Sequence, residues 1–117
     1  MSKTFFGFAV ADGMFDGDCI LSRTELTPDE AREICEAGVV PALNPSHKTT
    51  IEAMRNRFGI DVEVPEKAPH VTLFKGDSII VMSVRGLPRL GGERAEYSQE
   101  EIDSATFKFA RWQVLER

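Results

Sequence analysis

The sequence predicts a single α/β domain over residues 1–117, with a mixed β-sheet of about five or six strands flanked by two to three helices. Short β-rich runs alternate with helical patterns that begin at capping residues and end at glycine. The 117 residues and 42% hydrophobic content allow one small core, to which a partner subunit would add. No repeat or second domain interrupts this pattern.

The first part of the chain predicts two strands, a helix and a third strand. Residues 5–11 alternate aromatic and small side chains before an Asp-Gly turn, which predicts a central first strand. Residues 19–26 predict a short second strand. Thr27 then begins a capping box for a helix over 28–37. The apolar run 39–43 is typical of a buried strand.

A turn and a helix start follow directly. Asn44, with the Pro-Ser pair after it, indicates a tight turn. Ser46 is the expected N-cap of a helix over 48–58, and Gly59 ends that helix. The interval 39–51 is therefore a strand, a turn and a helix start in immediate succession.

His47 thus stands at the predicted N-terminus of this helix. Unpaired backbone N–H groups and the positive end of the helix dipole favour an anion there. Ser46, Thr49 and Thr50 add hydroxyl donors, and Lys48 adds a positive charge. A histidine beside a bound phosphodiester can act as a general acid or base without a metal. The alternative is that His47 only hydrogen-bonds nearby backbone.

The second part of the chain predicts a hairpin, a short helix and a closing strand. Segments 70–74 and 78–84 are β-rich and are joined by a Lys-Gly-Asp loop at 75–77. Ser98 begins a second capping box for a short helix. The alternation over 107–114 predicts the last strand.

Further candidate ligand groups lie in this second part. His70 begins the predicted hairpin. The loop after the hairpin carries Arg85, Arg89 and Arg94, whose forked guanidinium groups could clamp phosphates. Arginine-rich loops are usually just solvated, so these residues alone are a weak indication of a site.

Composition and motifs exclude several function classes. The net charge of −5 argues against general binding of duplex nucleic acid. Two cysteines without a Cys-x-x-Cys pattern argue against a zinc site or a disulfide framework, and no Walker, dinucleotide-binding or nucleophile-elbow motif is present. We expect a cytoplasmic protein with reduced thiols, no cofactor, no metal and no membrane span.

Four segments match the pattern of a known family: the opening strand in 3–15, the His-Lys-Thr-Thr-Ile start at 47–51, the hairpin at 75–83 and the closing segment 97–112. The His-Lys-Thr-Thr-Ile element is the most specific. On these segments the chain resembles small α/β proteins of archaeal viruses, phages and bacteria, first seen in a turreted icosahedral virus. That family includes viral anti-CRISPR ring nucleases.

The resemblance implies a homodimer, in the host cytoplasm if viral, that cuts cyclic tetra-adenylate or a related ring without a metal. The ribose 2′-OH attacks the adjacent phosphorus, and the histidine matching His47 protonates the leaving 5′ oxygen. An arginine of the family corresponds to Arg85, which would neutralise transition-state charge. The expected ligand-binding residues are Asn44, Ser46, Lys48, Thr49, Thr50, His70 and Arg89.

The chain departs from the family pattern on the ligand side. Asn44-Pro45-Ser46 precedes His47 where the family has glycine, and Phe8 and Ala11 stand where the family places polar residues. His70 replaces another ligand-side arginine. Three readings therefore stay open: cleavage of a cyclic nucleotide, sequestration of one without cleavage, and inhibition of a host protein by docking.

Overall fold

The computed structural model describes residues 2–86 and 98–116. The elements in order are β1 (Thr4–Gly7), the 3₁₀ helix η1 (Asp12–Met14), β2 (Ile20–Leu26), α1 (Pro28–Ala37), β3 (Val40–Pro41), α2 (Lys48–Phe58), β4 (Ser78–Arg85), α3 (Gln99–Ser104) and β5 (Thr106–Glu116). The predicted fold class, a single α/β domain with a mixed sheet, is confirmed.

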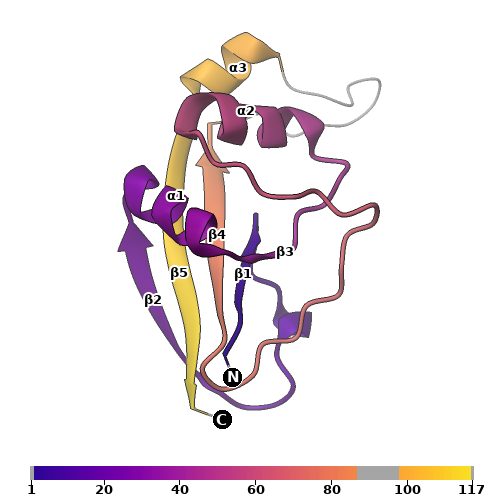
Figure 1. Ribbon diagram of the computed structural model, residues 1–117, viewed down its shortest axis with the longest axis vertical. Coiled ribbons are helices and arrows are strands. Elements are labelled where there is room, and N and C mark those ends of the chain that lie inside the picture. Colours follow the sequence, from indigo (N-terminus) through magenta and orange to yellow (C-terminus); the bar gives the residue numbers. More distant parts are fainter. Residues whose placement is uncertain (1, 87–97, 117) are drawn as a thin grey trace.

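The described residues form one five-stranded sheet in the order β2-β5-β4-β1-β3 (Figure 1). β1 is parallel to both β3 and β4, whereas β5 is antiparallel to β4 and to β2. The first strand is thus an interior strand, as predicted. β1, β2, β3 and β4 run in the same direction, so their carboxyl ends all lie at the same end of the sheet. We call this end the carboxyl edge; it is distinct from the outer strands β2 and β3.

Both α1 and α2 pack on the same face of the sheet (Figure 1). Their apolar side chains meet alternate residues of the strands, since successive strand residues point to opposite faces. The buried residues of this main core are Phe6, Ala31, Leu43, Ile51, Met54, Ile60, Val62, Ile80, Met82 and Phe109.

The bounds of α1 and α2 agree with the sequence prediction. In the capping box of α1, the N–H of Glu30 donates to Oγ1 of Thr27 at 3.1 Å, and the N–H of Thr27 donates to Oε1 of Glu30 at 2.9 Å. Gly59 follows α2 with a φ of 64°, a conformation in which glycine carries no steric penalty. Local signals therefore suffice to define these helices.

The expected N-cap of α2 is wrong by one residue. His47 occupies the N-cap position and makes no side-chain capping hydrogen bond. Ser46 instead donates from its N–H and its Oγ to Oδ1 of Asn44, at 3.0 and 2.8 Å. Asparagine accepts well from a backbone N–H two residues later, so Ser46 belongs to the turn and not to the helix start.

Three predicted strands differ in the structure. The first, predicted over 5–11, ends at Gly7. Residues 70–74 form no strand, because β1 and β5 already occupy both sides of β4. The turn after them does form: the N–H of Asp77 donates to the carbonyl oxygen of Phe74 at 2.9 Å. The predicted buried strand at 39–43 is reduced to β3, a two-residue edge strand in which Val40 is 40% exposed.

The opposite face of the sheet is covered by chain without regular helices other than η1. Val71 and Leu73 pack there against Phe5 and Ile79. The N–H of Leu73 donates to the carbonyl oxygen of Met14 at 2.7 Å, which ties this connector to η1. The part of this face nearer the carboxyl edge holds the pocket described below.

Candidate functional site

The carboxyl edge brings together three segments that are far apart in the sequence. The chain leaves β1 through 8–11, β3 through 42–47 and β4 through Arg85 and Gly86. In open sheets, ligands bind outside the carboxyl ends of parallel strands, where neighbouring connections lead in opposite directions. β1 and β3 meet this condition, because the connection after β1 leads through η1 on the face opposite the helices, whereas the connection after β3 leads into α2 on the helix face.

His47 lies at this edge, at the N-terminus of α2. Its N–H donates to the carbonyl oxygen of Asn44 at 3.1 Å, and its carbonyl oxygen accepts the N–H of Ile51 at 3.0 Å. The side chain is exposed, and its ring centroid lies 5.9 Å from that of Phe8. His47 is thus the N-cap residue of α2, and its exposed imidazole accepts no hydrogen bond from the backbone N–H groups of the first turn.

The neighbouring predicted residues share this turn and the first turn of α2. Asn44 and Ser46 form the turn through the bonds described above. Thr49 and Thr50 are half-buried in α2. The exposed Lys48 lines a separate groove of about 300 Å³, together with Arg55 and other residues of this region. The structure therefore gathers these five residues in one region, although Lys48 also borders another surface.

Arg85 is the last residue of β4 and is exposed. It pairs in register with Thr106, and strand alternation places it on the same sheet face as Val81 and Ser83. Among the residues described, no hydrogen bond or ion pair joins Arg85 to His47. Arg89 and Arg94 lie outside the described residues.

His70 lies in the connector between α2 and β4 and is exposed. The next residue, Val71, packs with Phe5 on the face opposite the helices. Within residues 2–86 and 98–116, no hydrogen bond, ion pair or ring contact joins the two histidines. His70 thus makes no direct contact with His47.

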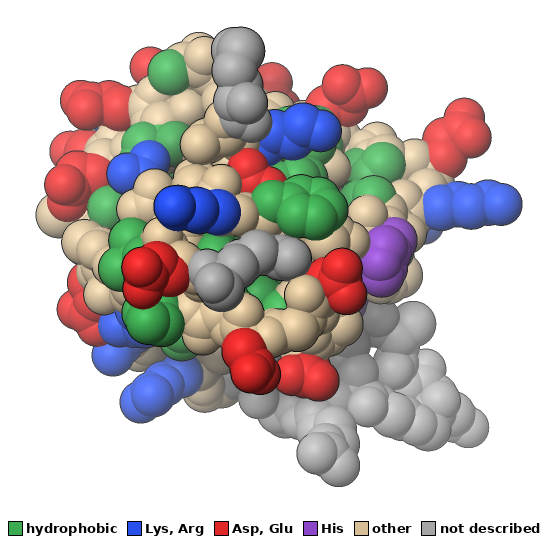
Figure 2. Space-filling view, turned by 90° about the horizontal axis from the view of Figure 1, so that it is seen from below, with side chains coloured by type: hydrophobic (Ala, Val, Ile, Leu, Met, Phe, Trp, Pro, Cys, Tyr) green, Lys and Arg blue, Asp and Glu red, His purple; other side chains and the backbone are tan. Residues whose placement is uncertain are grey.

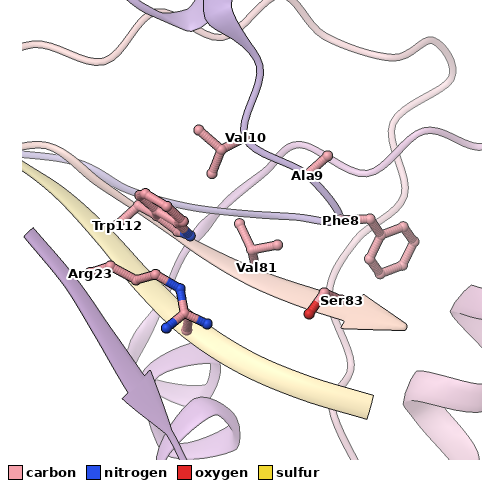
Figure 3. Close-up of a pocket in the computed structure, with 8 residues that line it drawn as sticks. Phe8, Ala9, Val10, Arg23, Val81, Ser83 and Trp112 are labelled. Atoms are coloured by element: carbon pink, nitrogen blue, oxygen red, sulfur yellow. The ribbon is translucent and has the colours of Figure 1, made fainter. Parts of the chain in front are cut away.

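A pocket of about 360 Å³ opens beside Phe8 on the face opposite the helices (Figure 3). Its other walls come from β2, β4, β5 and the segment after β1. The lining residues are Phe8, Ala9, Val10, Arg23, Val81, Ser83, Ala110 and Trp112. Phe8 lines this pocket and also contacts His47, so the pocket adjoins the carboxyl edge.

Sequence reasoning assigned none of these pocket residues to a site, and Phe8 entered only as a departure from the family pattern. The alternation over 107–114 does place Ala110 and Trp112 on one face. It cannot show that both long helices pack on the other face and leave this one open. Arg23 was equally hidden, because only the pairing of β2 with β5 brings it opposite Trp112.

Arg23 provides a positive charge at the pocket. Its Cζ lies 5.7 Å from the ring centroid of Trp112, and its Nη1 lies 3.4 Å from Oε1 of Glu25. The side chains of Arg23 and Glu25 are 40% and 68% exposed. Such an exposed ion pair contributes little stability, so it hardly restrains the guanidinium.

No protein-family model matches the sequence, and no curated protein matches it. The structure matches B116 of Sulfolobus turreted icosahedral virus with a TM-score of 0.64. The sequence identity is 15%, and the match covers 96% of this chain and 99% of B116. The chain has the fold of B116. The predicted relation to the turreted-virus family is thus supported at the level of the fold.

Over the described ranges, no group of three or more His, Cys, Asp or Glu side chains is placed to hold a metal ion. Figure 2 shows acidic and basic side chains mixed on the end of the molecule that carries both termini. None of the helices in the described ranges has the length and apolar character that a membrane span requires.

The cysteines Cys19 and Cys35 are both free thiols. Burial raises the pKa of Cys35 from 9.0 to about 11, with a smaller contribution from the negative charge of Glu36. A thiol held in its neutral form is a poor nucleophile and a poor metal ligand. Cys35 is therefore a packing residue beside the main core.

Proposed function

We propose that this protein binds a cyclic oligonucleotide at the carboxyl edge and cleaves it without a metal. The observation that supports this most directly is the position of His47, exposed at a helix start without a side-chain cap. A phosphate bound there would accept hydrogen bonds from backbone N–H groups of α2. The imidazole would then lie beside the same phosphate, where it can transfer a proton.

In the proposed reaction, the ribose 2′ oxygen attacks the adjacent phosphorus as the bond to the 5′ oxygen breaks. The 2′-OH loses its proton to water, and the His47 imidazolium donates one to the leaving 5′ oxygen. The product is a linear oligonucleotide that ends in a 2′,3′-cyclic phosphate. In this proposal Arg85 neutralises negative charge on the phosphoryl oxygens. His70 takes no part in the reaction.

We further propose that the active form is a homodimer. A two-fold axis would present two copies of His47 to a ring that is itself symmetric. We also propose that this chain acts in the cytoplasm of an infected host, a proposal motivated by the fold that it shares with B116, a viral protein.

Sequestration of the ring without cleavage is the second candidate. In the described part of the chain, no side chain hydrogen-bonds the His47 imidazole, and its ring neighbour is Phe8. A general acid is normally oriented by a hydrogen-bonding partner, so this arrangement also suits a site that only binds. The two candidates share the ligand and differ in turnover.

The test is incubation of the purified protein with cyclic oligoadenylates of several ring sizes in EDTA, with products identified by mass spectrometry. The chain has two histidines, so His70→Ala is a matched control for His47→Ala. We expect linear products with a 2′,3′-cyclic phosphate from wild type and His70→Ala, and none from His47→Ala. Bound but intact rings would establish sequestration. Absence of binding to any ring would exclude both candidates.

A further inference from the structure

One aromatic ring, the indole of Trp112, forms a wall of this pocket, whereas Phe8 borders the pocket with its ring turned away from Trp112 (Figure 3). Phe8 follows β1 and Trp112 lies on β5, while Val81 and Ala110 contribute small side chains from the sheet between them. Aromatic and methyl surfaces of this kind favour a flat ring as ligand. The volume of about 360 Å³ lies within the range of small-molecule pockets.

Polar groups of the same pocket indicate that the ring belongs to an anionic molecule. Arg23 lies against Trp112 and forms an exposed ion pair with Glu25, and both are weak restraints. It can therefore turn towards a ligand phosphate at little cost. Ser83 lines the pocket from β4, and its hydroxyl can donate to or accept from the edge of a heterocycle.

The pocket adjoins the proposed phosphodiester site at Phe8, which lines the pocket and whose ring contacts that of His47. A base in the pocket would thus leave its sugar and phosphate close to the start of α2. We propose that the pocket binds one nucleobase of a nucleotide ligand, packed against Trp112, with Arg23 on a phosphate and Ser83 on the base edge. This inference rests on the proposed function and names the part of the ligand that the protein selects.

Trp112 is the only tryptophan of the chain, so tryptophan fluorescence reports on this pocket alone. The full-length protein would be titrated with adenosine monophosphate, with cyclic tetra-adenylate, and with ribose 5-phosphate and inorganic phosphate as ligands without a base. Stacking of a base on the indole should change the emission. We expect a saturable change with the first two ligands and none with the last two.

Variants then assign the contacts, with affinity measured by calorimetry so that the loss of tryptophan does not remove the signal. Trp112→Leu should weaken nucleotide binding about 5- to 150-fold, the range for one lost stacking contact, and Trp112→Phe should recover most of it. Arg23→Ala should weaken binding of adenosine monophosphate about tenfold, whereas Lys75→Ala, a matched loss of an exposed cation in the turn before β4, should not. Arg23 is exposed, so its variant tests the inference even if Trp112→Leu fails to fold.

The outcomes separate this inference from the proposed function. Binding or cleavage of a ring with unchanged emission, and with wild-type affinity in Trp112→Leu and Arg23→Ala, would overturn the nucleobase pocket and leave the proposed function intact. Saturable quenching by adenosine monophosphate without any cleavage would support the pocket and contradict the nuclease. Emission that depends on protein concentration but not on nucleotide would show that a second copy covers this face, which also overturns the inference.

Discussion

The ring of Phe8 lies 5.9 Å from the ring of His47 between centroids, with the two planes inclined by 34°. This contact joins the segment that follows β1 to the start of α2. The half-buried Phe8 thereby links the His47 turn to the pocket on the opposite face from the helices.

Phe8→Leu should remove this ring contact and keep most of the packing. Because an aromatic ring shifts the resonances of protons near it, the Hε1 signal of His47 should move in the NMR spectrum, while that of His70 stays in place. The change conserves most of the side-chain volume, so the free energy of unfolding should fall by no more than about 1.5 kcal/mol. An unchanged His47 resonance would show that the rings are not in contact in solution.

The turn before α2 should depend on Asn44 more than on Ser46. Oδ1 of Asn44 accepts two hydrogen bonds from Ser46, so Asn44→Ala removes both of them. We expect a loss of about 1 kcal/mol in unfolding free energy for Asn44→Ala and only a few tenths, roughly 0.3 kcal/mol, for Ser46→Ala. Urea titrations of the two variants provide the comparison. The reverse order of stability would restore Ser46 as the N-cap.

Asp77 should be important for stability because its buried carboxylate fastens the N-terminus to the turn before β4. Its Oδ1 accepts the N–H of Lys3 at 2.8 Å, and its Oδ2 accepts the N–H of Phe74 at 2.9 Å. Asp77→Ala leaves both donors without this acceptor and should cost about 2–4 kcal/mol in denaturant unfolding. The two amides should also exchange hydrogen faster.

Asp77→Asn is the matched control for this prediction. The side-chain amide keeps one acceptor oxygen in a nearly identical shape, so the variant can retain one of the two bonds. Its unfolding midpoint should therefore lie between those of the wild type and Asp77→Ala. Equal midpoints for all three proteins would mean that the carboxylate does not hold the N-terminus.

Local sequence signals predicted the parts of this fold that local interactions determine. The capping box at Thr27 and the glycine after Phe58 define α1 and α2 without reference to the rest of the chain. Strand partners are determined by the whole sheet instead. Residues 70–74 have a β-rich composition and a suitable turn, yet β1 pairs with β4 in parallel from Thr4 and Ser78 onwards and takes that position.

The candidate site divides in the same way. The position of His47 at a helix start could be predicted because it depends on a turn and a helix within a few residues of it. Arg23 and Trp112 are 89 positions apart and meet only because β2 and β5 pair in antiparallel register. A pocket whose walls come from three strands needs the sheet order, which periodicity within one segment does not contain.

Cys35 should react with alkylating reagents only at high pH. Its pKa of about 11, against the ordinary 9.0, lowers the thiolate fraction at pH 8 by about 100-fold, and the thiolate is the reactive form. A Cys19→Ser protein has Cys35 as its one remaining thiol, and its iodoacetamide reaction can be followed from pH 7 to 11 (roughly the range that spans both pKa values). In urea, the unfolded chain should react with a midpoint near 9.0 and the folded chain with one near 11. The pH dependence is the relevant measurement, because partial burial slows the reagent at every pH.

The raised pKa of Cys35 also makes the stability of the fold depend on pH. Because the pKa is higher in the folded state, the contribution of Cys35 to the free energy of unfolding is complete below pH 9.0 and is lost as the pH rises towards about 11. Glu36→Gln should lower the folded midpoint by a minor part of the shift, since burial is the larger cause. Identical midpoints in folded and unfolded protein would contradict the burial of this thiol.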